Sequence, residues 1–442
     1  MKNFVSIRSK ITPFDKVINV PGDKSISIRW VLLASRALGK SKAFNLLESE
    51  DVKSAIKAMR RLGVKIIKKN NFYEINGFGL QSFNKKKNII IDAGNSGTLA
   101  RLICGLLSNY NQRVKIVGDK SLSKRDFYRV IEPLKKFGVN IESKSGKLPV
   151  KIIGNNDLRP ISFTEYKGSA QVKSAIMIAA LNTPGITTLK CPPSRNHTEI
   201  MFKNCLKIPI KITRKKSYEI IQVEGLKKIN KFDYNIPGDI SSAAFFMVLT
   251  LLAKKSKLKI KNVNINPSRT GIIEILKRMN GKIHLSNKRM YKGELISDIN
   301  IHSTKNLKAI NCPKHLNTKS IDEFLIIFLL CAKAKGVSKF TGIQELRNKE
   351  SDRLMIASKF LRMIGIKIDV SFDSIYIKGQ PNLELKKNYV IKNFLKDHRV
   401  FMMASIAANV LGGNFRIYDK NSIKSSFPNF IQLLKRLGSK IN

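Results

Sequence analysis

The sequence has few of the residues that bind metals or form disulfides. Its 442 residues include five cysteines and five histidines, and no two cysteines form a CxxC pair. A sparse and odd number of scattered cysteines is typical of reduced, intracellular proteins, and this spacing matches no common zinc motif. We therefore expect a cytoplasmic protein without a zinc site.

Long hydrophobic runs are missing as well. The N-terminal segment MKNFVSIRSKITPF lacks the apolar stretch of a secretory signal. The longest apolar stretches, 243–253 and 324–332, are too short to cross a bilayer. We expect both stretches to form buried helices, and we expect no association with a membrane.

Acidic residues are scarce relative to basic ones. The chain has 82 Lys and Arg against 31 Asp and Glu, a formal net charge of +51. Such an excess favours anionic partners, which include nucleic acids, membrane surfaces and small anionic metabolites. However, a nucleic-acid-binding face requires clustered basic residues, and here they are dispersed along the chain. Because Lys, Ile and Asn are all plentiful, we attribute most of the excess to compositional drift.

A phrase typical of a helix end recurs along the chain. A basic and apolar segment meets a glycine, and a β-branched run follows, as in RRLGVKI and LRMIGIKI. Glycine supplies the left-handed conformation that ends a helix. The instances lie at Gly63, Gly138, Gly281, Gly365 and Gly438, with a degenerate one near Ile208. Their near-even spacing predicts six α/β units, and PGDKSIS at 21–27 is echoed by PGDISS at 237–242, which indicates two halves.

The first of these two phrases opens a predicted helix. Asp23 or Ser25 is a good N-cap, and Gly39 is expected to end the helix. Lys24 and Ser25 then lie at the positive end of the helix, which favours phosphate or carboxylate. Arg29, one turn later, adds a second cation. A capped helix with a surface lysine remains an equally good interpretation of this motif alone.

Three further segments place small polar and basic residues before an apolar helix. They are GNSGT at 94–98 with Arg101, SKRD with Lys124 and Arg125, and GSAQVKSA with Ser169, Gln171 and Lys173. Each is a weak signal by itself. Together with the first motif, they indicate helix N-termini that converge on an anion.

The second half has three comparable helix starts. Asp322 and Glu323 precede an apolar run, either as partners of the helix dipole or as catalytic carboxylates. Glu350 and Arg353 are three residues apart, so they pair with each other or face a ligand. His398 and Arg399 stand at the start of another apolar helix.

Read in order, these motifs resemble those of the 5-enolpyruvylshikimate-3-phosphate (EPSP) synthase family. The matching phrases run from residue 21 to residue 430 and include PGDKSIS, GNSGT, GSAQVKSA, SRNHTE, IDEF, ELRNKESDRL, DHR and SFPNF. GSAQVKSA and SRNHTE are similar to the branch called class II. The resemblance implies transfer of the enolpyruvyl group of phosphoenolpyruvate to the 5-hydroxyl of shikimate 3-phosphate, by addition and elimination, within aromatic amino acid and chorismate biosynthesis.

The resemblance also implies an architecture. The family fold is a two-domain, inside-out α/β barrel of six βαβαββ units, with the active site in the cleft between the domains. Here domain 1 is expected to comprise residues 1–20 plus 237–442, and domain 2 residues 21–236. The resemblance implies a monomer that uses no metal and no organic cofactor.

Site residues follow from the family motifs. The resemblance implies catalytic roles for Lys24, Asp322 and Glu350. It implies that shikimate 3-phosphate or phosphoenolpyruvate is bound by Lys24, Ser25, Arg29, Asn95, Gly97, Thr98, Arg101, Arg125, Ser169, Gln171, Ser194, Arg195, Asp322, Lys349, Arg353, His398 and Arg399.

The chain departs from the family pattern at three positions. Ile28 replaces a common histidine, Asp126 replaces the proline that often follows the Lys-Arg pair, and Ser425 replaces a lysine found in some members. Two alternatives stay open. UDP-N-acetylglucosamine enolpyruvyltransferase shares the fold but typically has a cysteine in the loop that corresponds to GDKSLSKRD, which has none. A nucleic-acid-binding protein is the second alternative.

Overall fold

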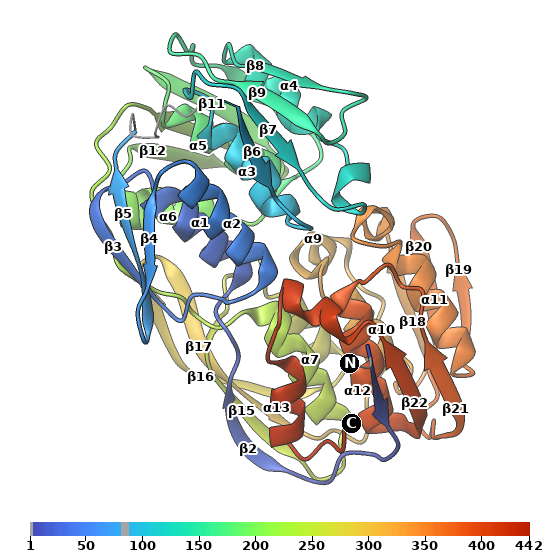
Figure 1. Ribbon diagram of the computed structural model, residues 1–442. Coiled ribbons are helices and arrows are strands. Elements are labelled where there is room, and N and C mark those ends of the chain that lie inside the picture. Colours follow the sequence, from blue (N-terminus) through green and yellow to red (C-terminus); the bar gives the residue numbers. More distant parts are fainter. Residues whose placement is uncertain (1–2, 81–87) are drawn as a thin grey trace. The chain divides into compact units, whose positions relative to one another are not determined.

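The computed structural model describes residues 3–80 and 88–442 (Figure 1). Contacts between residues divide the chain into two compact units. Unit 1 comprises Met1–Pro21, Pro237–Tyr291 and Leu295–Asn442, and unit 2 comprises Gly22–Ile236 and Lys292–Glu294. The chain therefore leaves unit 1 after Pro21 and returns to it at Pro237. Residues 292–294 belong to unit 2, although the residues on both sides of them belong to unit 1.

Unit 2 contains three four-stranded sheets within its described residues. Their strand orders are β14-β3-β5-β4, β6-β7-β9-β8 and β10-β11-β13-β12. The strands are β3 (Leu38–Phe44), β4 (Lys65–Lys68), β5 (Phe72–Phe78), β6 (Ile89–Asp92), β7 (Val114–Val117), β8 (Asn140–Ser143), β9 (Val150–Ile153), β10 (Ser162–Thr164), β11 (Ile186–Cys191), β12 (Ile210–Arg214), β13 (Glu219–Glu224) and β14 (Tyr234–Asn235). The helices are α1 (Lys24–Ala34), α2 (Glu50–Arg61), α3 (Gly97–Leu106), α4 (Tyr128–Lys136), α5 (Ala170–Ala180) and α6 (His197–Met201), with the short helices η1 (Leu122–Lys124) and η2 (Phe202–Leu206).

Unit 1 also contains three sheets in the part that the structure describes. Their orders are β16-β17-β15-β2, β18-β20-β19 and β1-β22-β21. The strands are β1 (Phe4–Ile7), β2 (Asp15–Asn19), β15 (Lys257–Asn264), β16 (Lys282–Tyr291), β17 (Glu294–His302), β18 (Val337–Thr341), β19 (Lys367–Val370), β20 (Ser374–Lys378), β21 (Leu385–Ile391) and β22 (Gly412–Tyr418). The helices are α7 (Ile240–Leu252), α8 (Gly271–Arg278), α9 (Asn317–Ser320), α10 (Phe324–Cys331), α11 (Arg353–Met363), α12 (His398–Leu411) and α13 (Phe430–Arg436), with η3 (Lys314–Leu316), η4 (Gln344–Asn348) and η5 (Lys420–Ser425).

The strand before each passage of the chain between the units pairs within the unit that the chain is leaving. Strand β2 precedes the first passage and pairs in parallel with β15, so that Asp15 faces Lys257. Strand β14 precedes the second passage and pairs in parallel with β3, so that Tyr234 faces Ala43. The two pairings close one sheet in each unit with a strand that is far away in the sequence.

The repeated helix-end phrase has the predicted structure at four glycines, and the prediction is wrong at Gly281, which has no positive φ. Helices α2, α4, α11 and α13 each end just before a glycine with positive φ, at Gly63, Gly138, Gly365 and Gly438. In the phrase with Gly281 the left-handed residue is Asn280, with φ of 68°, and in the degenerate phrase near Ile208 it is Lys207, with φ of 55°. Asparagine tolerates this conformation better than most residues, so Asn280 can end the helix in place of the glycine.

Two sequence predictions on helices are confirmed and one is wrong. The apolar stretches at 243–253 and 324–332 form α7 and α10, both almost fully buried. Helix α1 ends at Ala34, whereas Gly39 lies inside β3 with φ of 94°. Across residues 3–80 and 88–442, the structure has no helix with the length and hydropathy to span a membrane.

Packed helices form the core of each unit. In unit 1, α7, α10 and α12 contact one another and share one hydrophobic core with the surrounding sheets (Figure 1). In unit 2, α3 packs on α5 and on α1. The contact between α3 and α5 is very close, because a Cβ on Gly105 would lie 2.1 Å from the carbonyl oxygen of Ala175. This close approach brings Thr98 and Gln171, in the first turns of α3 and α5, within hydrogen-bond distance.

Candidate functional site

Three helices of unit 2 begin with a capped N-terminus, as the motifs predict. The side chain of Asp23 accepts a hydrogen bond from Ile26 N at the start of α1. Ser96 and Ser169 accept bonds in the same way at the starts of α3 and α5. These caps fix the helix starts, whose positive ends favour anions.

A chain of hydrogen bonds links α3 to α5. Arg101 donates to Oε1 of Gln171 over 2.8 Å, and Nε2 of Gln171 donates to the hydroxyl of Thr98 over 3.1 Å. Arg101 also donates to the backbone carbonyl of Asp126 and lies 4.9 Å from the centre of the Phe127 ring. The partners of this guanidinium are therefore uncharged groups.

Gly97 lies between two guanidinium groups. A Cβ at this position would be 2.9 Å from Nη1 of Arg101 and 3.0 Å from Nη1 of Arg125. Arg125 in turn donates to Oδ1 of Asn95 over 2.8 Å. Burial, followed by repulsion from Arg125 and Arg129, lowers the pKa of Arg101 to about 10. A crowded and partly buried group of cations of this kind attracts an anion.

The first motif places Lys24 and Ser25 at the start of α1, and both are partly exposed. The ammonium of Lys24 lies 2.9 Å from Oδ2 of Asp51, a residue of α2. The sequence motifs did not predict Asp51 as a site residue, because the helix dipole alone explains an acidic residue in the first turn of α2.

Arg29 lies deeper than its predicted role suggests. Its side chain is buried, its Nε donates to Oγ1 of Thr198, and its Nη2 donates to Oγ of Ser174, each over 2.8 Å. Arg29 thus links α1 to α5 and α6. Ser194 and Arg195 lie between β11 and α6, and within the described part of the chain the buried hydroxyl of Ser194 has no hydrogen-bond partner.

In unit 1, Arg353 is surrounded by carboxylates. Its Nε donates to Asp397 over 2.9 Å, its Nη2 donates to Glu350 over 2.5 Å, and its Nη1 lies 3.4 Å from Asp322. Burial alone would lower the pKa of Arg353, but Asp397, Glu350 and Asp322 outweigh burial and raise it. The guanidinium stays charged and holds three acidic side chains together.

A second arginine of unit 1 contacts the same carboxylate. Arg399 donates to the backbone carbonyl of Asp322 over 2.6 Å, and its Nη2 lies 3.9 Å from Oδ2 of Asp322. Asp397 caps α12 by accepting from the backbone N–H of Arg399. His398 lies beside them, with its Nδ1 3.2 Å from the hydroxyl of Ser425.

The predicted residues divide between the two units, and we call the two groups the unit 2 cluster and the unit 1 cluster. The unit 2 cluster consists of Lys24, Ser25, Arg29, Asn95, Gly97, Thr98, Arg101, Arg125, Ser169, Gln171, Ser194 and Arg195. The unit 1 cluster consists of Asp322, Lys349, Glu350, Arg353, His398 and Arg399. The sequence motifs did not single out Asp397 or Thr198, although both lie inside the phrases DHR and SRNHTE, so a residue-by-residue reading of those phrases could have found them.

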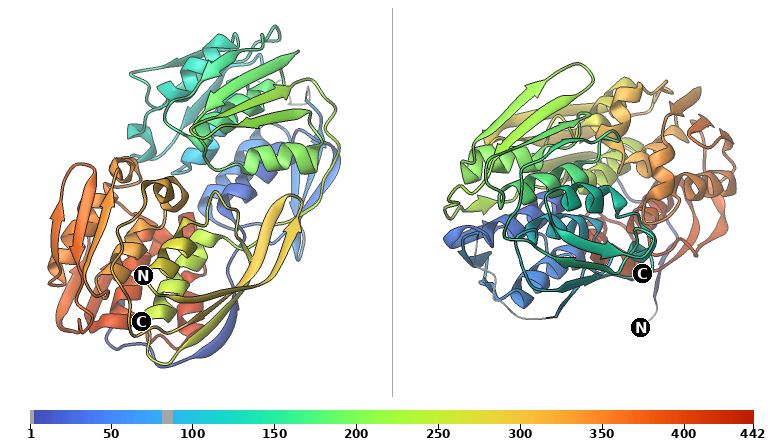
Figure 2. Two further views of the ribbon diagram at one scale, coloured as in Figure 1. Left: turned by 180° about the vertical axis from the view of Figure 1, so that it is seen from behind. Right: turned by 90° about the horizontal axis from the view of Figure 1, so that it is seen from above.

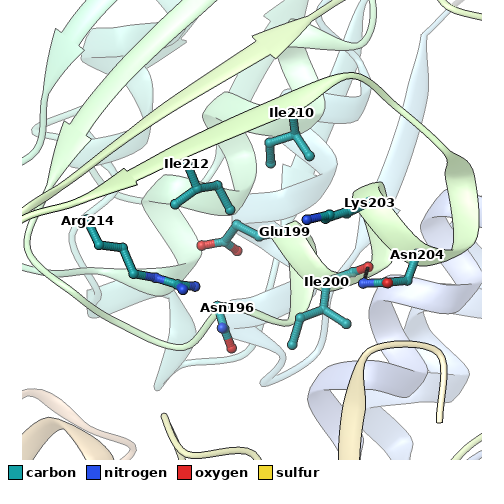
Figure 3. Close-up of a pocket in the computed structure, with 8 residues that line it drawn as sticks. All are labelled: Asn196, Glu199, Ile200, Lys203, Asn204, Ile210, Ile212 and Arg214. Carbon is teal, nitrogen blue, oxygen red and sulfur yellow. Dashed lines mark hydrogen bonds between the residues drawn. The ribbon is translucent and has the colours of Figure 1, made fainter. Parts of the chain in front are cut away.

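A pocket of about 200 Å³ lies elsewhere in unit 2 (Figure 3). Residues of α6, η2 and β12 line it together with Asn196, and Figure 3 shows Glu199, Lys203 and Arg214 among them. None of the lining residues belongs to either predicted cluster. The pocket therefore shares no residue with the predicted site, although Asn196 directly follows Arg195 in the chain.

Comparisons with known proteins point to one family. The family model of EPSP synthase (3-phosphoshikimate 1-carboxyvinyltransferase) matches residues 9–434. The 3-phosphoshikimate 1-carboxyvinyltransferase of Ruthia magnifica subsp. Calyptogena magnifica is 42% identical over 430 residues and covers 96% of each chain. That of Zymomonas mobilis subsp. mobilis is 37% identical over 438 residues, 98% of this chain and 96% of the relative.

Solved structures agree with these relatives. EPSP synthase from Acinetobacter baumannii has a TM-score of 0.87 and 35% identity, with 99% of both chains covered. The enolpyruvyl transferase NikO from Streptomyces tendae has a TM-score of 0.77 at 15% identity, with 99% of this chain and 98% of that chain covered. The second likeness shows the fold alone.

Proposed function

The chain belongs to the EPSP synthase (3-phosphoshikimate 1-carboxyvinyltransferase) family, and on this premise we propose which of its residues carry the reaction. The enzyme transfers the enolpyruvyl group of phosphoenolpyruvate to shikimate 3-phosphate and releases phosphate, a step of aromatic biosynthesis. The family match covers almost the whole chain, so the activity belongs to the chain as a whole.

The unit 2 cluster binds the anionic groups of the substrates. The observation that carries this proposal is the position of Arg101 and Arg125, which flank Gly97 and whose hydrogen-bond partners are uncharged. The phosphate of phosphoenolpyruvate fits between them, with Asn95, Gly97 and Thr98 lining the site. Shikimate 3-phosphate binds through the residues at the starts of α1 and α5 and before α6, which are Lys24, Ser25, Arg29, Ser169, Gln171, Ser194 and Arg195.

The unit 1 cluster moves the protons. The 5-hydroxyl of shikimate 3-phosphate adds to C2 of phosphoenolpyruvate while the methylene carbon gains a proton, and loss of phosphate and of a methyl proton then restores the double bond. Asp322 accepts the hydroxyl proton, and Glu350 delivers and removes the carbon proton, with Lys24 assisting. Arg353 holds both carboxylates in place, as general acid–base catalysis requires.

Anions of the substrate also bind in unit 1. Lys349, Arg353 and Arg399 are the cations of this cluster, with His398 beside them. Because Arg353 is neutralised by three carboxylates in the structure, the carboxylate of phosphoenolpyruvate competes with them for its donors. Binding of substrate therefore loosens Glu350 from Arg353 and readies it for proton transfer.

The finer architecture is part of the same proposal. The six sheets are copies of one βαβαββ unit, of which β6-α3-β7-α4-β8-β9 and β10-α5-β11-α6-β12-β13 give the element order. Domain 1 comprises 1–20 plus 237–442 and domain 2 comprises 21–236, and residues of both domains take part in the reaction. The protein acts as a monomer in the cytoplasm and does not associate with a membrane.

A phosphate-release assay tests the activity. Purified protein is incubated with phosphoenolpyruvate plus shikimate 3-phosphate, with each substrate omitted in turn, and the organic product is identified by mass. Release that requires both substrates supports the proposal. The control replaces shikimate 3-phosphate by UDP-N-acetylglucosamine. Phosphate release with UDP-N-acetylglucosamine but not with shikimate 3-phosphate would contradict the proposal.

A further inference from the structure

The last three residues of the phrase SRNHTE have no assigned role. They form the start of α6, which spans only the five residues His197–Met201. A helix of this length cannot hold its position by its own hydrogen bonds, so contacts with its neighbours must fix it. His197, Thr198 and Glu199 are 0%, 0% and 3% exposed, so all three side chains make such contacts.

His197 contacts the tip of a hairpin. Its Nδ1 lies 2.6 Å from Oε1 of Glu294, whose side chain is 1% exposed. Glu294 lies at the turn between β16 and β17, a long hairpin coloured yellow in Figure 2. The turn is seated tightly, because a Cβ on Gly293 would lie 2.3 Å from Nδ2 of Asn204 in η2.

Thr198 points toward two other helices. Its hydroxyl accepts from Nε of Arg29 in α1 over 2.8 Å and lies 2.7 Å from the hydroxyl of Ser174 in α5. Ser174 also accepts from Nη2 of Arg29. These three side chains form a closed, buried triangle of hydrogen bonds, and such networks give rigid and specific packing.

Glu199 adds a buried ion pair. Its Oε1 lies 2.5 Å from the ammonium of Lys173 in α5, and the Lys173 side chain is 0% exposed. An ion pair between two buried groups is expensive to separate, since either charge would then remain buried without a partner. Consecutive residues of α6 are thus tied to three different elements, namely the hairpin turn, α1 and α5.

The segment that precedes α6 contains two of the predicted site residues. Ser194 and Arg195 lie two and three residues before His197, in a stretch without regular structure that begins after β11. We propose that His197, Thr198 and Glu199 are positioning residues that hold Ser194 and Arg195 in place for the phosphate of shikimate 3-phosphate. The inference rests on the proposed function, and it adds Glu294, Ser174 and Lys173 as their supports.

The test uses substitutions that keep side-chain size. Thr198→Val removes the hydroxyl without burying a new charge, and Thr198→Ser retains the hydroxyl. Glu294→Gln weakens the separate contact with His197, which does not involve Arg29. Thr183→Val is the matched control, because Thr183 is also buried in unit 2 but, among the described residues, its hydroxyl donates to the backbone carbonyl of Ala179 and to no other side chain.

Steady-state kinetics with each substrate varied separately gives the result, and thermal melts show that the variants are folded. We expect Thr198→Val and Glu294→Gln each to raise the KM for shikimate 3-phosphate about tenfold, because small misplacements of binding groups are costly. The KM for phosphoenolpyruvate should change much less, and Thr198→Ser and Thr183→Val should resemble the wild type. A merely structural role would lower the active fraction without separating the two KM values.

The possible failures are distinguishable. If wild-type protein does not consume the two substrates together, the proposed function is wrong. If wild-type protein is active and both variants keep the normal KM for shikimate 3-phosphate, the positioning role is wrong. An effect of Thr198→Val without any effect of Glu294→Gln would also overturn it, because the change would then act through Arg29 alone.

Discussion

The two clusters hold their arginines in different ways. In unit 2, Arg29, Arg101 and Arg125 donate to hydroxyls, side-chain amides and backbone carbonyls. In unit 1, Arg353 donates to three carboxylates, and Arg399 contacts one of the same three. Arg101 and Arg125 of unit 2 thus donate to uncharged groups, whereas Arg353 of unit 1 is paired with carboxylates of the protein.

The pKa shifts follow this difference. Burial and neighbouring cations lower the pKa of Arg101 to about 10. Arg353 is also buried, yet the surrounding carboxylates raise its pKa. An uncompensated group of cations binds anions, and carboxylates held by a cation are placed for proton transfer. This difference supports the proposal that unit 2 chiefly binds the anions and unit 1 chiefly transfers protons.

The largest effect is expected from the carboxylates of unit 1. Glu350→Gln and Asp322→Asn should each lower turnover by about 10²-fold or more, because each removes a carboxylate that we propose as a general acid or base. The exposed Glu345, in η4 near the same cluster, gives the control Glu345→Gln, which should be close to normal. Phosphate release at saturating substrates measures the effect, and unchanged turnover in both variants would remove the assignment.

The next largest effect concerns a cation of unit 2. Arg125→Gln should raise the KM for phosphoenolpyruvate about 10- to 100-fold, which corresponds to the loss of charge-assisted hydrogen bonds. Lys124→Gln alters the neighbouring, exposed cation and should have little effect. Initial rates at varied phosphoenolpyruvate decide the matter, and equal effects of the two changes would indicate a diffuse rather than a local attraction.

A smaller effect is expected at the glycine between the arginines. Gly97→Ala places a methyl group 2.9 Å from Arg101 and 3.0 Å from Arg125, so the guanidinium groups must move apart. Because these are the far ends of flexible side chains, we expect the KM for phosphoenolpyruvate to rise only about tenfold or less. A normal KM would show that the space between the two arginines is not used by the substrate.

The smallest effect is expected at a departure from the family pattern. Ser425 stands where some members have lysine, and its hydroxyl lies 3.2 Å from Nδ1 of His398. Ser425→Ala should change kcat/KM by less than about tenfold, since one neutral hydrogen bond contributes little. A loss as large as that of Arg125→Gln would mean that His398 depends on this contact.

The local features of both clusters could be predicted from the sequence. The caps at Asp23 and Ser169, the pair Glu350–Arg353 and the helix starts at Gly97 and His398 each depend on residues within a few positions of one another. Such short-range patterns follow directly from capping and helix geometry. The mixed α/β fold with two units followed from the repeated phrase and the family motifs.

Contacts between distant segments could not be predicted in this way. Asp397 lies 44 residues from Arg353, Thr198 lies 169 residues from Arg29, and β14 pairs with β3 from the far end of unit 2. No local period or spacing encodes these contacts, which arise when the sheets and helices pack. The error at Gly39 has a similar origin, because the pairing of β3 with β5 takes that glycine into a strand.

The most direct test of the division between the clusters is the kinetics of Glu350→Gln and Arg125→Gln, measured side by side for kcat and for the KM of phosphoenolpyruvate. We predict that Glu350→Gln lowers kcat but leaves this KM normal or lower, because Arg353 then has one carboxylate fewer to neutralise it. Arg125→Gln should chiefly raise the KM. The same pattern in both variants, or a raised KM with normal kcat in Glu350→Gln, would contradict the account.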